Sequence, residues 1–189
     1  MLRTISDTRS GHHIPPGWSY NPSEWPERVL LIACALAGLG IAMYLSLYQL
    51  GVLSSVWEPL FGNGSRVVLH SGIARLVPIP DALLGAFGYL VEVIAGVIGG
   101  SDRWRAMPGI VLLYGFTVGA LGMISILLVI FQPVLFHAWC TLCLASAAIS
   151  VNLVGPVMDE VLASLQFLKR ERARGCPVWD IMRGQTERQ

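Results

Sequence analysis

Hydrophobic residues gather into four long stretches that are separated by polar segments and by segments containing glycine and proline. The stretches run from Val29 to Leu50, Ala82 to Gly100, Pro108 to Phe131 and Phe136 to Gly155. Each is close to the roughly 20 residues that an α-helix needs to cross a bilayer. Because hydrocarbon offers no partner for free backbone N–H and C=O groups, such stretches must form helices. The pattern therefore predicts an all-α integral membrane protein built as a four-transmembrane-helix bundle.

The charged residues are few and lie almost entirely between the apolar stretches. Hydrophobic residues make up 54% of the sequence and charged residues 13%, which is about half the charged content of an ordinary soluble domain. The formal net charge is only +1, which argues against a nucleic-acid partner. Glu92 is the one Asp, Glu, Lys or Arg inside the stretches. We interpret this costly carboxylate either as a proton relay or as a protonated acid bonded to a neighbouring helix.

The distribution of Lys and Arg predicts how the helices are oriented. Segments 1–28, 101–107 and 156–189 carry three, two and six of these residues, whereas 51–81 carries two and 132–136 carries none. Positive charge concentrates in cytoplasmic loops, so both termini are expected in the cytoplasm. The protein should be multi-pass, with the lipid bilayer as its surroundings.

Three regions follow from this topology. Residues 1–28 form an N-terminal tail with a short interfacial segment, residues 29–155 form the membrane domain, and residues 156–189 form an amphipathic C-terminal tail. The tail alternates apolar and charged residues, which predicts a helix that lies on the membrane or continues the fourth span. Between the first and second helices, segment 51–81 is expected to fold back over the bundle as a periplasmic lid.

Two cysteines near the start of the fourth stretch are the candidates for chemistry. In Cys140-Thr-Leu-Cys143 the i, i+3 spacing puts both sulfur atoms on one helix face, with Cys143 about 4.5 Å deeper. The free N–H groups and the dipole of a helix N-terminus favour a thiolate. On the oxidising side of a membrane such a pair can close a disulfide. A redox pair and two ordinary buried thiols both stay open, because a lone CxxC is a weak motif.

The remaining histidines and cysteines offer little further chemistry. A zinc site would need two more ligands, and His70 and His137 are the only histidines on that side, so we predict no metal site. His137 lies three residues before Cys140 and either stabilises the thiolate or is an interfacial residue without a role. Cys34 is expected to be an inert mid-span residue, and Cys176 to stay a thiol in a reducing cytoplasm.

Two segments carry a resemblance to a known family. The stretch FGNGSRVVLHSGIARLVPIPDALLGAFGYL, followed by HAWCTLCLASA, resembles bacterial vitamin K epoxide reductase homologues in order and spacing, over most of 29–155. The resemblance implies a four-helix bundle in the bacterial inner (cytoplasmic) membrane, folded around a quinone such as ubiquinone or menaquinone. It also implies that the CxxC passes electrons to the quinone while disulfides form in exported proteins.

Four residues take roles from this resemblance. Cys140 corresponds to the outward thiol that exchanges disulfides, and Cys143 to the thiol beside the quinone ring. Ser71 matches the family's loop serine near that site. Asp81 falls where some relatives have a polar residue that hydrogen-bonds a quinone carbonyl, although a carboxyl must be protonated to donate such a bond.

The sequence also departs from the family pattern. These enzymes usually carry two loop cysteines that relay electrons to the CxxC, but the second corresponds here to Ser65, and residues 57–59 at the first read Trp-Glu-Pro. A hydroxyl cannot undergo thiol–disulfide exchange, so the chain has no internal shuttle. Ala147 stands where some relatives have a tyrosine, which argues against vitamin K epoxide as the substrate.

Two functions are compatible with these observations. The first is a thiol–quinone oxidoreductase in which a thioredoxin-like periplasmic partner, or another external thiol protein, exchanges directly with Cys140. The second is a catalytically degenerate scaffold that binds quinone or lipid as a subunit of a larger membrane assembly. The surviving CxxC favours the first, and the missing relay cysteines favour the second.

Overall fold

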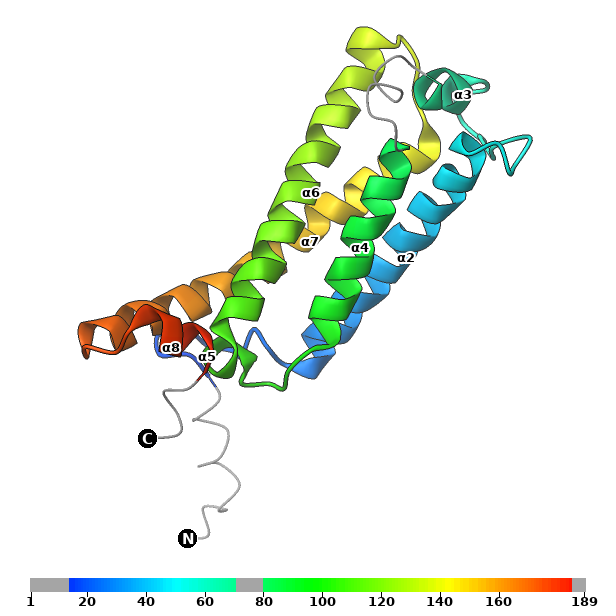
Figure 1. Ribbon diagram of the computed structural model, residues 1–189. Coiled ribbons are helices and arrows are strands. Elements are labelled where there is room, and N and C mark those ends of the chain that lie inside the picture. The colour runs from blue at the N-terminus through cyan, green and yellow to red at the C-terminus, as the bar shows by residue number, and fades with distance from the viewer. Residues whose placement is uncertain (1–13, 71–79, 185–189) are drawn as a thin grey trace, which may run out of the picture.

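Helices form all the regular structure in the part of the chain that the computed structural model describes, residues 14–70 and 80–184. In chain order they are α2 (Trp25–Gln49), α3 (Gly64–Leu69), α4 (Asp81–Val97), α5 (Arg103–Ala106), α6 (Pro108–Leu135), α7 (Thr141–Ala173) and α8 (Val178–Met182). The four longest run side by side, α2 along α4 and α6 along α7. Helix α3 lies at one end of this bundle, and α5 and α8 lie at the other (Figure 1). The predicted all-α class is confirmed.

Three of the helices are long and apolar enough to cross a membrane. These are α2, α6 and α7, with 25, 28 and 33 residues. Their outward faces carry large apolar side chains such as Phe116, which is 75% exposed, as expected of surfaces that face lipid. The remaining bundle helix, α4, has 17 residues and so measures about 26 Å, slightly less than the roughly 30 Å of a hydrocarbon core.

The core between the helices combines small residues with buried aromatic rings. Tyr89 of α4 and Tyr114 of α6 are 1% and 2% exposed. Gly38 of α2 faces the Tyr89 ring so closely that an added Cβ would lie 2.4 Å from Cε1 of the ring. Close backbone approach through small residues is typical of helix packing in membranes, where the surrounding lipid provides no hydrophobic drive between helices. Gly38 thereby sets the spacing of α2 and α4.

The boundary between the third and fourth helices differs from the predicted one. Helix α6 continues through Pro133 to Leu135, and α7 begins at Thr141 and not at Phe136. A proline in the last turn of a helix removes only one backbone N–H from the ladder, so the helix can end just after it. The chain turns at His137, which has a φ of 50°, and this turn leads directly into the CxxC.

Helix α7 is one continuous helix through residue 173. It joins the fourth apolar stretch to the charged C-terminal segment, so of the two arrangements predicted for that segment, it is the continuation of the helix that is observed. In Figure 1 its second half leaves the bundle toward α8. The boundary proposed at residue 155 falls inside this helix and stays a prediction.

The end of the bundle that carries α5 and α8 is held by a buried polar network. The Arg103 guanidinium forms an ion pair with Glu160 of α7, and both side chains are almost fully buried. Glu160 also accepts a hydrogen bond from the Ser23 hydroxyl. Arg28 donates to the backbone carbonyls of Ile98 and Gly99, at 3.0 and 2.8 Å. These bonds satisfy carbonyl groups at and just beyond the C-terminus of α4, which would otherwise be orphaned.

Candidate functional site

The two cysteines of the CxxC are joined by a disulfide at the N-terminus of α7. Their Cα atoms are 5.2 Å apart. Cys140 is the residue that caps the helix, and its Sγ accepts the backbone N–H of Cys143 at 3.2 Å. The N–H of Cys140 itself donates to Oε1 of Gln132 in α6, at 2.9 Å. Because the fourth apolar stretch begins at Phe136, Cys140 was expected inside the first turns of the helix. It lies instead directly before the first helical residue, Thr141.

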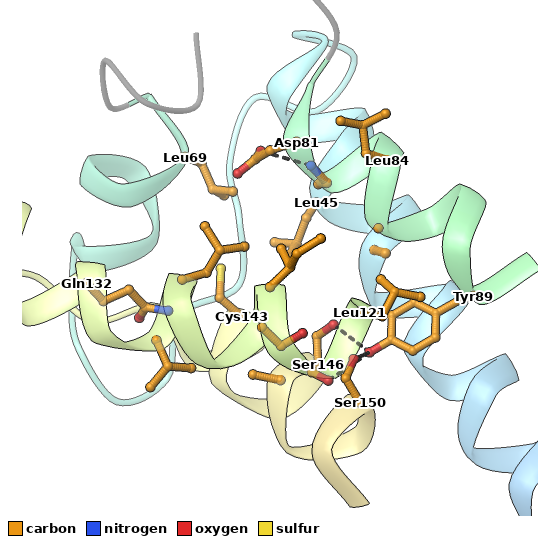
Figure 2. A pocket seen from close by; sticks show the side chains of 18 residues that line it. Leu45, Leu69, Asp81, Leu84, Tyr89, Leu121, Gln132, Cys143, Ser146 and Ser150 are labelled. Carbon is orange, nitrogen blue, oxygen red and sulfur yellow. Dashed lines mark hydrogen bonds between the residues drawn. The ribbon is translucent and has the colours of Figure 1, made fainter. Parts of the chain in front are cut away.

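A cavity of about 270 Å³ lies between α2, α4, α6 and α7, next to this disulfide. Its wall is mainly aliphatic, with polar groups contributed by Asp81, Gln132, Ser146 and Ser150 (Figure 2). Cys143 is part of the wall, and Figure 2 shows its sulfur atom among the lining side chains. Cys140 is not part of the wall and has no exposed surface. The two sulfur atoms of one disulfide therefore lie in different surroundings.

Asp81 closes the cavity on the side of α3. It is the first residue of α4, and its Oδ1 accepts the backbone N–H of Ala82 at 2.8 Å and a hydrogen bond from Nε2 of Gln49. The same Nε2 also donates to the carbonyl of Leu69 at 3.3 Å. Gln49 thus connects the ends of α2, α3 and α4. Asp81 could be predicted from the sequence but Gln49 could not, because nothing in the sequence links a glutamine to an aspartate 32 positions later.

Tyr89 lines the opposite side of the cavity. Its hydroxyl lies 2.7 Å from the Ser146 carbonyl and 2.6 Å from Oγ of Ser150, one turn further along α7 (Figure 2). Ala147 lies between these serines in the wall and brings no polar group. Glu92 follows Tyr89 by three residues on α4 and is 1% exposed. Within the described residues neither of its carboxyl oxygens has a hydrogen-bond partner, so the predicted bond to a neighbouring helix is not observed there.

The segment before α3 and the start of α3 contact the residues on either side of Cys140, Trp139 and Thr141. We call residues 57–65 the cap. The carboxyl group of Glu58 accepts hydrogen bonds from the hydroxyls of Ser65 and Thr141 and from the backbone N–H groups of Thr141 (3.1 Å) and Phe61 (3.4 Å). Gly64 packs against the turn before Cys140, where an added Cβ would lie 1.9 Å from the Trp139 carbonyl oxygen.

The Glu58 carboxyl is ionised in this setting. Partial burial by itself would raise its pKa, but the bonds donated by Ser65, Thr141 and Phe61 favour the charged form and bring the pKa below its ordinary value of 4.5. In the sequence, Glu58 stands out only as part of the tripeptide 57–59 at the first relay position. Ser65, at the other relay position, is fully buried and bonded to it.

The other predicted site residues lie apart from the cavity or outside the described residues. Ser71 falls in segment 71–79, which the structure does not describe. A ring nitrogen of His137 lies 3.0 Å from the Pro133 carbonyl, in an exposed position. In residues 14–70 and 80–184 no group of three or more His, Cys, Asp and Glu side chains is arranged to hold a metal ion.

The chain matches the model of the Vitamin K epoxide reductase family over residues 29–156. It belongs to this family. The matched residues contain the disulfide, the cavity wall and the cap. No match was found among curated proteins or among solved structures.

Family membership agrees with the long apolar helices and makes this a multi-pass membrane protein. The family consists in general of membrane oxidoreductases that act on thiols and quinones. The chain is thus assigned to that general class of enzyme.

Proposed function

We propose that this protein takes electrons from a periplasmic dithiol, passes them through the Cys140–Cys143 disulfide to a quinone, and so supports disulfide formation in exported proteins. One observation carries the proposal: Cys143 lines the cavity, whereas Cys140 is fully buried between Trp139 and Thr141, the two residues that the cap contacts. A disulfide with this division can exchange with a protein partner at one sulfur atom and with a small molecule at the other.

The proposed topology has four spans, because α4 crosses the membrane in addition to α2, α6 and α7. A helix of 17 residues is at the lower end of the range for a span. Both termini then face the cytoplasm, in agreement with the distribution of Lys and Arg. The disulfide and the cap lie at the periplasmic end of an inner-membrane bundle. The cap, residues 57–65, is part of the segment 51–81 that was predicted to form the lid.

The cavity suits the head group of a quinone. Its volume of about 270 Å³ is near the lower limit for small-molecule sites, so it admits a ring and not a long isoprenoid tail. Leu84 of α4 and Ile124 of α6 line the cavity and are 49% and 52% exposed. They mark an apolar opening toward lipid through which a tail can leave. A bound quinone supplies an acceptor for two electrons and two protons.

The residues of the chain then have the following roles. A thiolate of the partner attacks Sγ of Cys140, which forms a mixed disulfide and releases Cys143 as a thiolate. The second partner thiol resolves the mixed disulfide, so the partner is oxidised and Cys140 and Cys143 are both reduced. The thiolate of Cys143 then lies beside the cavity, in the first turn of α7. Asp81 provides a carboxyl group at the cavity edge. Re-forming the disulfide releases two electrons and two protons.

An external partner is needed because neither relay position holds a cysteine: residues 57–59 at the first read Trp-Glu-Pro, and the second is Ser65. A thioredoxin-like protein is the simplest such partner. Since Cys140 has no exposed surface, the partner must displace the cap before it can attack. The partner's own surface then replaces the contacts of Gly64 and Glu58.

The proposal is tested by following the thiols directly. The protein is purified in detergent, treated with a reduced thioredoxin-like protein and then with oxidised ubiquinone or menaquinone, and quenched at intervals with a mass-tagging thiol reagent. We expect Cys140 and Cys143 to become reduced together and then to be reoxidised together. A Cys143→Ser variant should consume no quinone, and Cys34→Ser is the matched control. Independent behaviour of the two cysteines, or normal quinone consumption by Cys143→Ser, would refute the proposal.

The degenerate scaffold is the second candidate. It is favoured by the sealed position of Cys140 and by the loss of both relay cysteines. In that case quinone binds in the cavity and changes the thermal stability of the protein, while the disulfide never exchanges with the partner. The thiol-trapping experiment separates the two candidates.

A further inference from the structure

Glu58 places a negative charge on the N-terminus of α7, next to the disulfide. Its Oε2 accepts the backbone N–H of Thr141, which is the first residue of the helix and directly follows Cys140. The carboxyl group thus occupies one of the N–H groups that a helix N-terminus has available for an anion. A loop residue 83 positions earlier in the chain provides this helix with its external cap.

The groups bonded to Glu58 are all neutral. They are hydroxyl and backbone N–H donors of Ser65, Thr141 and Phe61. Within residues 14–70 and 80–184 no basic side chain forms an ion pair with Glu58: the His70 ring meets Tyr48 edge to face, His137 lies against the Pro133 carbonyl, and Arg66 is exposed. Asp81, the other acidic group at this end of the described chain, lines the cavity and adds no positive charge.

The location of this charge affects the two redox states of the cysteines differently. A helix N-terminus ordinarily stabilises a thiolate, which stabilises the reduced pair and makes its disulfide a stronger oxidant. A fixed carboxylate at the same N-terminus repels a thiolate there but leaves the uncharged disulfide unaffected. We propose that Glu58 is a positioning residue that sets the redox poise of the Cys140–Cys143 pair, by keeping the disulfide favoured over the dithiol.

This inference deepens the proposed function, because it takes the same pair as the redox centre. It predicts that the pair is a mild oxidant, which accepts electrons only from a strongly reducing partner. Once reduced, the pair readily gives its electrons to an acceptor. Glu58 belongs to the tripeptide 57–59 at the first relay position and acts through its charge.

The test measures the equilibrium of the pair without quinone or partner. Wild-type protein and the Glu58→Gln variant are equilibrated in detergent with dithiothreitol buffers at several pH values, and their thiols are trapped with a mass-tagging reagent. We expect Glu58→Gln to be reduced more easily, by about tenfold in the equilibrium constant, or about 30 mV for a two-electron couple. The difference should grow as pH rises, because only then does the variant form a thiolate. The alkylation rate of the reduced pair should likewise rise at lower pH in the variant.

Two further pairs of variants separate charge from packing. Ser65→Ala and Thr141→Val each remove one hydrogen bond but keep the carboxylate, so each should shift the equilibrium less than Glu58→Gln does. Leu60 is a cap residue that is 71% exposed and lies two residues from Glu58, so Leu60→Lys adds a compensating charge without removing a hydrogen bond of Glu58. Relative to its neutral control Leu60→Gln, it should shift the equilibrium in the same direction as Glu58→Gln. This comparison stays decisive if Glu58→Gln does not fold.

Two results overturn the inference. One is an unchanged equilibrium constant in both Glu58→Gln and Leu60→Lys. The other is an equal shift in Ser65→Ala and Glu58→Gln, which would mean that a loosened cap and not the charge is responsible. Failure of the proposed function looks different, since the wild-type pair would then not exchange electrons with a thioredoxin-like protein and quinone, whatever its equilibrium with dithiothreitol.

Discussion

Each end of the bundle is tied together by a carboxylate, but the two carboxylates have opposite surroundings. At the end with α5 and α8, Glu160 is 1% exposed and forms an ion pair with the guanidinium of Arg103. At the end with α3, Glu58 accepts hydrogen bonds from the neutral groups of Ser65, Thr141 and Phe61. The first charge is cancelled by its partner and serves to hold helices together. The second forms no ion pair in the described part of the chain, so we expect its potential to act on the disulfide beside it.

The difference extends to how firmly each end is built. Arg28 and Arg103 both donate to carbonyls at the C-terminus of α4, which locks α4 to α2, α5 and α7. At the other end a loop and a six-residue helix rest on the CxxC turn. A redox centre that must meet a protein partner benefits from a cover that can be displaced, whereas the opposite end has no such requirement.

The largest expected effect comes from breaking the compensated pair. Arg103→Met leaves the Glu160 carboxylate buried without its cation, which should lower the free energy of unfolding by about 3–5 kcal/mol. Thermal unfolding in detergent measures this loss. Arg174→Met is the matched control, because it removes an ion pair with Glu171 whose arginine is 72% exposed, and such pairs contribute at most about 1 kcal/mol. Equal losses in the two variants would contradict the structural role of Glu160.

A third acidic residue, Glu92, extends the comparison, because it differs from both Glu160 and Glu58 in having no bonded partner within the described residues. It is buried, and within the described residues its oxygens have neither a cation nor a hydrogen-bond donor. Burying a polar group without a partner costs roughly 1–3 kcal/mol, so Glu92→Leu should raise the free energy of unfolding by that order. Glu92 relays protons if Glu92→Leu also abolishes quinone reduction, and if Glu92→Gln is inactive although it is as stable as the wild type. A loss of stability in Glu92→Leu would show that the carboxyl has a structural partner.

Lifting the cap tests whether the end with α3 is the displaceable one. Gly64→Ala forces a Cβ into the Trp139 carbonyl, and overpacking of this kind costs about 1–3 kcal/mol. The cap should then open roughly tenfold more often, since about 1.4 kcal/mol corresponds to a tenfold change in an equilibrium. The rate at which a small dithiol reduces the disulfide should rise accordingly. Gly40→Ala in α2, where an added Cβ meets nothing within 4 Å, is the control, and an unchanged rate in Gly64→Ala would refute the assignment of the cap.

The smallest effect is the pH dependence that Glu58 gives to stability. Because its pKa is lower in the folded protein than its ordinary value of 4.5, its bonds contribute stability that is fully present above that value. The contribution is lost as pH falls through the lowered pKa. Between pH 6 and pH 3 the unfolding temperature of wild type should therefore fall more than that of Glu58→Gln. Parallel curves for the two proteins would mean that the carboxyl is not stabilised in its charged form.

Much of the fold was predictable because its causes are local. The four apolar stretches became α2, α4, α6 and α7, since the number of consecutive apolar residues decides whether a helix is long enough for a membrane. The helix boundaries were harder to predict. Arg28 donates hydrogen bonds to carbonyl groups just beyond Val97, where α4 ends. Helix α6 continues through Pro133 until the chain turns toward Cys140. These ends depend on contacts between segments that are distant in the sequence.

Some residues of the candidate site could likewise be predicted from the sequence, and others could not. Cys140 and Cys143 could be chosen from their spacing and their position, and Asp81 from the resemblance to a family. Gln49, Gln132 and Glu58 could not be chosen, because their significance arises only when they bond to Asp81, Cys140 and Thr141. A single glutamine near the end of a helix, or a single glutamate in a loop, carries no sequence signal of its own.

The sequence by itself determined that this chain is a helical membrane protein with a dithiol pair at the start of its last long helix. Helix length and an i, i+3 spacing are properties of neighbouring residues, so they need no tertiary information. Only the tertiary structure decided that Cys143 lines a cavity, that Cys140 lies under a cap, and that Glu58 adds its charge to the N-terminus of α7. Packing brings together groups from opposite parts of the chain, and the surroundings of each sulfur atom depend on that packing.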